Sequence, residues 1–436
     1  MKKVYFLTSV VPGADIHTGF LASIKTFCRK RNAELLLLPT PFACSPEDSL
    51  PEEILGLDNI LHKDFYLSKK IRFAAIPIKP QAVDPVTGLQ RQSQKDGSFI
   101  FASPKQRLKL VPNGQVKYPH AMMGTGALTT PRYKDDRIGR IAFEDHVIGG
   151  LIVEVNGPTE YHFRQVQADD KGAFIDLGNE YSASGIKWVG AEVLVPGDIH
   201  AMETDPAVKA VIIELLEKFK PKYTIIHDLL SGISVNHHER DQLISRALNF
   251  VTLEEESRLT YLELLSYAKK SNKLYVVRSN HDIWIDDYVE EMIYRNEPHN
   301  YKFASMIANQ KMDGRIGIEA AIRHFERRGE LANVTFMQED EDLILTPKKI
   351  QFGAHGHRGP NGSRGTLRSM EMSYGRSMSG HTHVPEILRE ARSVGTSTHT
   401  RLPYNKGSSS WLQTLGMTYY NGSTQLINII NGKYHT

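Results

Sequence analysis

The sequence predicts an α/β protein built from two units, residues 1–188 and residues 189–436. Three observations support this fold class. The chain has 436 residues, which is too long for one average domain. Short apolar runs that are typical of buried strands alternate with amphipathic stretches of helical spacing. Near residue 188 the pattern also changes, from strand-like pieces separated by Pro, Gly and Asn to regular strand–helix alternation.

The first unit opens with one strand–helix–strand segment. The run "KVYFLTSV" (3–10) predicts a buried strand, "TGFLASIKTFCRKR" (18–31) a helix, and "AELLLLPT" (33–40) a second strand. Strand-like pieces follow, among them "RIGRIAF" (137–143), and favour a sheet-rich continuation. We interpret residues 1–188 as an accessory α/β domain that serves substrate recognition or homo-oligomerisation, and both roles stay open.

The second unit predicts a mostly parallel sheet with helices on its faces. Its three strands end at loops that carry polar residues, and helical patterns lie between them. A helix start is indicated by Asp205-Pro206, and a hairpin by "GMTYYNGSTQLINIINGKY" (416–434). The predicted strands are "AEVLVPGDIH" (191–200), "KYTIIHDLLSG" (222–232) and "NKLYVVRSNHD" (272–282), and the helices include "HERDQLISRALNFVT" (238–252) and "LEEESRLTYLELLSYAKKS" (253–271).

Composition excludes several classes of protein. The formal net charge of +3 is too small to indicate a nucleic-acid partner by itself. Cys28 and Cys44 form no CxxC pattern and no disulfide framework, so we expect a reducing, cytoplasmic location. No stretch approaches the roughly 20 apolar residues that cross a bilayer, and we expect no membrane association. The apolar run at the start is better read as a strand than as a signal peptide.

Polar residues that can ligate a metal follow the strands of the second unit. Because the carboxyl ends of parallel strands meet at one sheet edge, these side chains are expected to lie together. The donors are oxygen and imidazole without thiolate, which suits Mn, Fe, Zn or Mg. The candidates are Asp198 and His200 in "GDIH", Asp228 in "HDLLSG", Asn280 and His281 in "RSNHD", His355 in "AHGHRG", and His381 and His383 in "SGHTH".

This order of blocks resembles the calcineurin-like metallophosphoesterase superfamily, whose pattern is D-x-H, GD-x-x-[D/E/N], GNH[D/E], H and GHxH. The resemblance covers roughly residues 190–430. It implies a sheet sandwich with flanking helices, in which two divalent ions clamp a phosphoryl group and activate water. Manganese is expected first, with magnesium, iron or zinc as alternatives. His227 and Ser279 stand where the family has glycine, and Ser231 stands where it has an acidic or amide residue.

The resemblance also implies a role for each ligand. Asp228 would bridge the two ions, and His281 would protonate the leaving-group oxygen or stabilise charge in the transition state, with Asp282 orienting its ring. His355 is preferred to His357 because the family's ligand immediately precedes a glycine. One metal would be held by Asp198, His200 and His383, and the other by Asn280, His355 and His381.

Basic side chains near these blocks are candidate substrate contacts. The segment between the last two ligand blocks contains Arg358, Arg364 and Arg368, which either bind phosphate or form a solvated face. In "NHHERD" (236–241), His237 or His238 is a candidate substrate contact, although Asn236 and Glu239 equally fit a helix capping box. The acidic run "QEDEDLI" (338–344) is expected to be exposed.

A second Asp-Ile-His, at residues 15–17, lies between the first strand and its helix. The strands that follow offer no counterpart of the other blocks, so a turn is predicted there and not a metal site. Thr18 or Asp15 is the expected helix cap.

The expected function is divalent-metal-dependent phosphoester hydrolysis, with a nuclease (DNase) as the first hypothesis and DNA or another phosphoester polymer as the partner. A large N-terminal half beside such a domain is similar to phage-encoded DNases of this superfamily. One alternative is a phosphomonoesterase or a nucleotide or cyclic-nucleotide phosphodiesterase, in which Trp284, Tyr288 or Tyr374 would clamp a base. Another is a catalytically inactive metal-binding scaffold.

Overall fold

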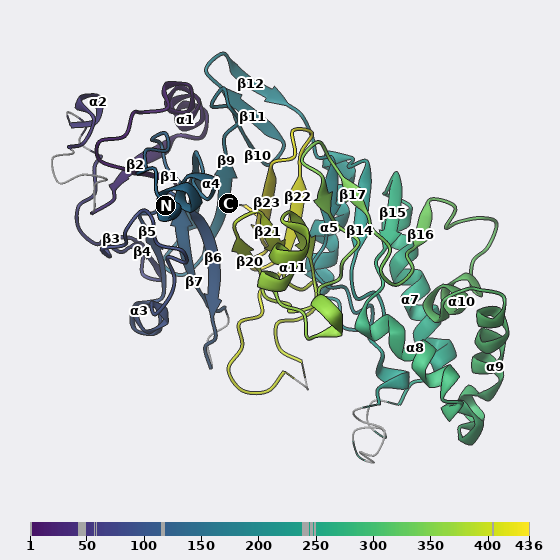
Figure 1. Ribbon diagram of the computed structural model, residues 1–436. Helices are drawn as coiled ribbons and strands as arrows, with labels where there is room; N and C mark the ends of the chain where they lie inside the picture. The colour runs from purple at the N-terminus through teal and green to yellow at the C-terminus, as the bar shows by residue number, and fades with distance from the viewer. Residues whose placement is uncertain are drawn as a thin grey trace.

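The computed structural model describes residues 2–41, 49–55, 57, 59–114, 118–237, 244, 247, 250–402 and 405–435. Its described strands form four sheets, and the helices between residues 253 and 323 gather at one end of the molecule, which Figure 1 shows on the right. The protein is therefore a mixed α/β structure, as the sequence predicts. No described helix is long and apolar enough to cross a membrane.

A six-stranded sheet forms the centre of the second half. Four of its strands run parallel, and a C-terminal hairpin adds two antiparallel strands at one edge. This arrangement confirms the alternation and the hairpin predicted from the sequence. In order across the sheet the strands are β16 (Val334–Phe336), β15 (Lys273–Val276), β14 (Tyr223–Ile226), β13 (Val193–Val195), β22 (Thr414–Thr418) and β23 (Thr424–Asn428).

Helices cover one face of this sheet. The first of them is capped by Asp205, whose side chain accepts from the Ala207 N–H, and Pro206 occupies its first turn, as predicted. Apolar side chains of these helices form one core cluster with those of the sheet. The helices are α5 (Pro206–Phe219), α7 (Leu253–Ala268), α8 (Asn280–Glu290), α9 (Pro298–Met312) and α10 (Gly317–Arg323), with single turns η1 (Ile233–Val235) and η2 (Ile293–Asn296). The predicted helix 238–252 lies largely outside the described residues.

A ten-stranded sheet packs on the other face and joins the two halves of the chain. β6 of the first half pairs antiparallel with β20 of the second half. Strands from both large sheets contribute to one further core cluster. In order the strands are β17 (Ile344–Leu345), β18 (Ile350–Gln351), β19 (Ser377–Ser379), β21 (Ala391–Ser393), β20 (Glu386–Leu388), β6 (Gln106–Val111), β7 (His120–Thr125), β5 (Ser98–Phe101), β4 (Ile71–Phe73) and β3 (Phe65–Ser68).

These two sheets sharing a core agree with a sheet sandwich, while the specific metallophosphoesterase fold stays a prediction. The domain boundary at residue 188 also stays a prediction. It falls between β12 and β13, although the ten-stranded sheet contains strands from both sides of it.

The first half contributes two smaller sheets at the other end of the molecule (Figure 1). The predicted strand–helix–strand opening is present, and its two strands pair in parallel. The elements are β2 (Ala33–Pro39), β1 (Lys2–Val10), β8 (Gly149–Asn156) and β9 (Tyr161–Gln167) in one sheet, and β10 (Phe174–Asp176), β11 (Asn179–Ser182) and β12 (Gly185–Trp188) in the other. The remaining described helices are α1 (Thr18–Arg31), α2 (Glu52–Leu55), α3 (Gln90–Asp96), α4 (Arg137–Glu144), η3 (Pro360–Gly362) and α11 (Leu367–Tyr374).

Two local expectations in the first half are wrong. Residues 137–143 form helix α4 instead of a strand, because the Asp136 side chain accepts from the Gly139 N–H and caps a helix there. The N-cap of α1 is His17, whose Nδ1 accepts from the Phe20 N–H, and not Thr18 or Asp15. The second Asp-Ile-His is nevertheless a helix-start turn, as predicted, and its histidine is used for capping.

Candidate metal centre

The predicted ligands follow five strands of the two large sheets. Asp198 and His200 follow β13, and Asp228 follows β14. Asn280 is the first residue of α8, directly after β15, since Ser279 accepts from the Asp282 N–H and starts the helix there. The serine that replaces the family's glycine at 279 therefore acts as a helix cap. His355 follows β18, and His381 and His383 follow β19.

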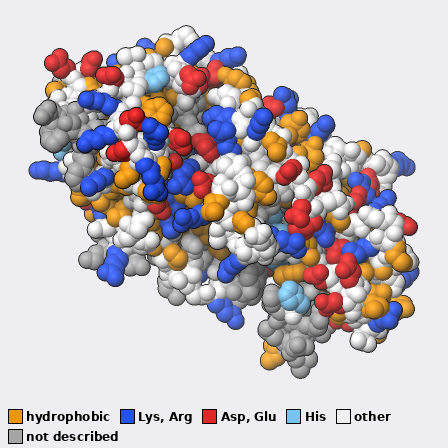
Figure 2. Space-filling view, viewed as in Figure 1, with side chains coloured by type: hydrophobic (Ala, Val, Ile, Leu, Met, Phe, Trp, Pro, Cys, Tyr) orange, Lys and Arg blue, Asp and Glu red, His pale blue; other side chains and the backbone are white. Residues whose placement is uncertain are grey.

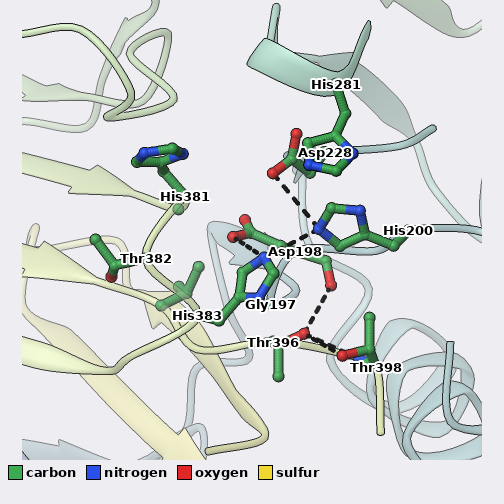
Figure 3. A network of polar contacts seen from close by, with 12 residues as sticks. Gly197, Asp198, His200, Asp228, His281, His381, Thr382, His383, Thr396 and Thr398 are labelled. Carbon is green, nitrogen blue, oxygen red and sulfur yellow. Dashed lines mark hydrogen bonds and ion pairs between the residues drawn. The ribbon is translucent and has the colours of Figure 1, made fainter. Parts of the chain in front are cut away.

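These side chains converge on one buried place (Figure 3). Three groups of ligand atoms each lie within 4.8 Å of one another, and Asp228 belongs to all three. The groups are Asp198, Asp228 and His383; Asp228, His355 and His381; and His200, Asp228 and His281.

The distances divide the centre into two halves around Asp228. On one side, His383 Nε2 lies 3.3 Å from Asp198 Oδ2 and 2.9 Å from His200 Nε2. On the other side, Asn280 Oδ1 lies 3.1 Å from both His355 Nε2 and His381 Nδ1. Asp228 Oδ2 faces both, at 3.5 Å from His200 Nε2 and 3.2 Å from His355 Nε2. The division of these ligands between two ions stays a prediction.

The residues fit a group of cations. Both carboxylate oxygens of Asp198 and Oδ1 of Asp228 are buried without a hydrogen-bond partner among the described residues. Buried carboxylates in that state are costly unless a positive charge compensates them. Two carboxylates, one amide oxygen and several imidazoles are donors that divalent ions of the first transition row accept. Buried His/Asp groups of this chain can therefore hold metal, and the identity of the ion is not fixed by the donors.

Most of the histidines are held neutral, which is the form that binds metal. Burial lowers the pKa of His200 to about 3 and that of His381 to about 4. His355 is the exception: burial acts to lower its pKa, but the nearby Asp228 and Asp198 raise it to about 9. Burial would likewise raise the pKa of Asp228, but the imidazoles around it, His355 first, keep that pKa well below its usual range. A cation binding at His355 must therefore displace a proton.

The backbone around the centre is strained. Four ligands adopt positive φ angles, which non-glycine residues rarely do: His200 (45°), Asp228 (45°), His381 (75°) and His383 (57°). A Cβ at Gly380 would lie 2.1 Å from Asp198 Oδ1, so only glycine leaves room for that carboxylate. The conformational cost at these positions is of the kind that functional sites retain.

His281 is fixed beside the metal ligands. Its Nδ1 lies 2.8 Å from the Ser231 carbonyl oxygen and donates to it, and its ring stacks on Trp284 with centroids 4.0 Å apart. Gly232 makes this stack possible, because a Cβ there would lie 2.6 Å from the Trp284 ring. The His281 ring lies edge-on to His200, with centroids 4.6 Å apart.

The predicted role of Asp282 is wrong. Its Oδ1 accepts from the Leu230 N–H at 3.1 Å and does not hold the His281 ring. Burial raises the pKa of Asp282 to about 7. The Ser231 carbonyl orients the imidazole instead, because the turn after β14 brings a backbone acceptor to its Nδ1, and Asp282 fixes that turn from the other side.

His355, rather than His357, lies among the ligand atoms. His357 belongs to none of the three groups, and its Nε2 lies 4.0 Å from Glu339 Oε1. His227, in the position of the family's glycine, is buried beside His355 with ring centroids 5.5 Å apart.

The candidate substrate residues differ in their exposure and in the side chains that they contact. Arg358 is exposed and pairs with Glu339 at 3.4 Å, so the acidic run 338–344 contacts the basic segment. Arg364 is exposed, and its charge contributes to lowering the pKa of His381. Arg368 is exposed on α11. The His237 ring lies edge-on to Trp284, with centroids 5.2 Å apart, and His238 lies outside the described residues.

Two contacts of the centre were not predicted from the sequence. Trp411 packs its ring against His383 with centroids 4.1 Å apart, and the Ser231 carbonyl binds His281. Neither has a local sequence signal, because each partner comes from a different part of the chain.

Comparison with known proteins adds one relative. The chain is 28% identical to Protein A1 of Escherichia phage T5 over an alignment of 472 positions, which covers 99% of this chain and 83% of that protein. No protein-family model matches the chain, and no solved structure matches it.

Proposed function

We propose that this protein is a divalent-metal-dependent phosphoester hydrolase and that it acts as a nuclease on DNA. The observation that carries the proposal is the shared position of Asp228, which belongs to every group of potential ligands. One carboxylate shared by two sets of oxygen and imidazole donors is the arrangement that a two-metal phosphoesterase needs. Two divalent ions, when bound, would polarise the phosphoryl oxygens and make water a nucleophile at neutral pH.

The chain's own residues would hold and protonate the substrate. The His281 ring offers a nitrogen within 4.8 Å of ligand atoms of His200 and Asp228. Because Nδ1 is occupied by the Ser231 carbonyl, Nε2 remains for the substrate. A proton held on Nε2 would pass to the leaving-group oxygen as the phosphorus–oxygen bond breaks.

Arginines beside the centre support a polymeric substrate. Arg364 and Arg358 are joined through a backbone bridge on the segment that follows His355. Guanidinium groups there would meet backbone phosphates next to the one that is cleaved. On the face shown in Figure 2, basic and acidic side chains are interspersed.

A nucleotide phosphodiesterase would need an aromatic side chain that clamps the base. Fewer aromatic residues are available for this role than the sequence analysis named. Tyr288 is buried, and its hydroxyl donates to Glu297 at 2.6 Å. Trp284 is stacked on His281. Tyr374 remains partly exposed. Retention of all seven predicted ligand positions argues against an inactive scaffold.

The test uses purified protein with Mn²⁺ or Mg²⁺ and four substrates: supercoiled plasmid, single-stranded DNA, p-nitrophenyl phosphate and bis-p-nitrophenyl phosphate. Cleavage of DNA that is abolished by His281→Ala and kept by His399→Ala, an exposed histidine that contacts Asp205 and lies outside the metal centre, would support the nuclease. Turnover of the small esters with intact DNA would contradict it. No turnover, together with fewer than two bound ions per chain, would favour the scaffold.

A further inference from the structure

A cavity lies between the two halves of the chain, apart from the metal centre. Its volume is about 270 Å³, and none of the metal ligands lines it. Its walls come from β6, β7 and β9 of the first half and from the hairpin region of the second half, which lie side by side in Figure 1. Cavities at such junctions are preferred places for small ligands.

The walls of this cavity are largely apolar and aromatic. Tyr118, Tyr161 and Phe163 line it together with Leu110, Leu412 and Ile430. The rings of Tyr161 and Phe163 are tilted by 32°, with centroids 6.4 Å apart, and the Tyr161 hydroxyl is bound by Ser98 at 2.6 Å. Aromatic walls of this kind suit a flat ring.

Buried polar atoms without partners also line the cavity. Asn428 is 1% exposed, and its Oδ1 accepts from the Phe163 N–H at 3.1 Å, so Nδ2 is the donor left without a partner. Both ring nitrogens of His120 are buried too, with the Ser93 backbone close to the ring. An unsatisfied buried donor destabilises the protein, so a ligand that supplies an acceptor here gains affinity.

These features disfavour an alkyl chain, which would leave the Asn428 donor unsatisfied. A heteroaromatic ring suits both the aromatic walls and this donor, since it has flat apolar faces and a polar edge.

The edge of the cavity carries one available positive charge. Lys70 lines it, is exposed, and makes no ion pair with the described residues. The acidic residue there, Glu160, is already bound by Asn156 at 2.8 Å and Asn431 at 2.7 Å. An anionic group on the ligand would therefore meet Lys70.

We propose that this cavity binds a nucleoside monophosphate, with the base among the aromatic residues, its edge on Asn428 and His120, and its phosphate near Lys70. The site is separate from the metal centre, so the inference does not rest on the proposed hydrolysis.

The experiment is isothermal titration of the full chain after metal removal with EDTA, using AMP, GMP, adenosine and inorganic phosphate as probes. We expect one binding site per chain for at least one nucleotide. His120→Phe, which keeps a flat ring and removes both nitrogens, should weaken binding about tenfold or more, equivalent to about 1.4 kcal/mol. Lys70→Ala should weaken nucleotide binding and leave adenosine binding unchanged. Lys69→Ala, an exposed neighbour that does not line the cavity, is the matched control.

Two results would overturn the proposal: no heat from either nucleotide at millimolar concentration, or binding that His120→Phe leaves unchanged. Inorganic phosphate binding as tightly as AMP would also overturn it. If His120→Phe fails to fold, Thr159→Trp replaces it, because Thr159 is an exposed lining residue whose enlargement blocks the cavity. The titration is done without metal, so its failure would leave the hydrolase proposal untouched, and an inactive hydrolase would leave this one untouched.

Discussion

The Nε2 atoms of His200 and His383 lie 2.9 Å apart, although 183 residues separate them in the sequence. Burial lowers the pKa of both rings, so both are neutral at physiological pH. Two neutral imidazoles thus direct ring nitrogens at one point, next to Asp198 and Asp228. This is the geometry expected of ligands that share a cation.

Metal stoichiometry tests this relationship. We expect two Mn²⁺ ions per wild-type chain after dialysis, measured by elemental analysis. His383→Ala removes a ligand of one ion only and should reduce the content to about one, whereas Asp228→Asn weakens both sites because Asp228 faces both. His399→Ala should keep the wild-type content. A His383→Ala protein that retains both ions at full occupancy would contradict the assignment.

Trp284 is expected to position His281 for proton donation. Trp284→Ala removes the stacked ring and should lower kcat about tenfold on a phosphodiester with a poor leaving group, since general acid catalysis supplies about 10²–10⁴-fold. The loss should be smaller on bis-p-nitrophenyl phosphate, whose leaving group needs little protonation. Trp284→Phe should restore most of the activity. Equal losses on both substrates would instead indicate general damage to the site.

Arg364 and Arg368 are expected to contact backbone phosphates of DNA. Each contact that is removed by substitution to Ala should reduce the slope of log affinity against log salt by about 0.7–0.9. Binding is measured by fluorescence anisotropy with metal-free protein at several salt concentrations. Lys187→Ala, an exposed residue on β12, is the control. Slopes that are identical for all three variants and the wild type would exclude a role for this segment.

Arg164 is expected to be essential for stability. It is fully buried and pairs with Glu154 and with Asp176, whose Oδ1 lies 2.7 Å from Arg164 Nε. Arg164→Met would remove the positive charge shared by two buried carboxylates, leaving Arg31 beside both and Gln425 donating to Asp176. It should lower the free energy of unfolding by about 3–5 kcal/mol. The measurement is urea denaturation followed by circular dichroism.

The matched control for Arg164 is Arg258→Met, which breaks an exposed pair with Glu255 and should leave the denaturation midpoint unchanged. Adding Asp176→Asn to Arg164→Met should recover part of the loss, because it removes one of the uncompensated charges. If the double variant were less stable than the single one, charge burial would not be the cause.

His146 is expected to make stability depend on pH. Burial lowers its pKa from 6.5 to about 4, and the neutral ring lies 2.8 Å from both the Thr129 carbonyl and the Tyr133 hydroxyl. The unfolded chain binds the proton more tightly than the folded chain. The contribution of neutral His146 to the free energy of unfolding is therefore fully present above pH 6.5. It is lost as the pH falls from 6.5 towards 4, and the loss amounts to about 3 kcal/mol.

His146→Gln removes this titration and keeps a donor for the Thr129 carbonyl. The melting temperature of this variant should fall less between pH 7 and pH 4 than that of the wild type. The measurement is differential scanning fluorimetry across that range. Parallel curves for the two proteins would exclude His146 as a source of acid sensitivity.

The strand ends, and the meeting of the candidate ligands beside them, were predictable from the sequence because both depend on simple rules. Apolar runs give the parallel strands, and the carboxyl ends of such strands meet at one edge. Asp198, Asp228 and Asn280 each follow such a run directly, so their meeting needs no knowledge of distant packing. The order of the motifs, compared with the superfamily pattern, then indicated which histidines are candidate ligands.

The remaining features depend on contacts between distant segments. The orientation of His281 by the Ser231 carbonyl depends on the shape of a turn, whereas the sequence indicated the adjacent acid Asp282. Helix α4 is decided by one cap, Asp136, in a segment whose isoleucines also fit a strand. The cavity around Asn428 forms only where both halves of the chain meet.

The pairing of β6 with β20 has a consequence for biosynthesis. Arg107 and its partner Leu388 are far apart in the chain, so β6 leaves the ribosome long before β20 exists. At a translation rate of about 5–20 residues per second, the edge of β6 that pairs with β20 would stay unpaired for roughly 15–55 s after its synthesis. An uncovered strand edge attracts other chains. During translation the nascent N-terminal half would need a temporary partner for this edge, such as a chaperone.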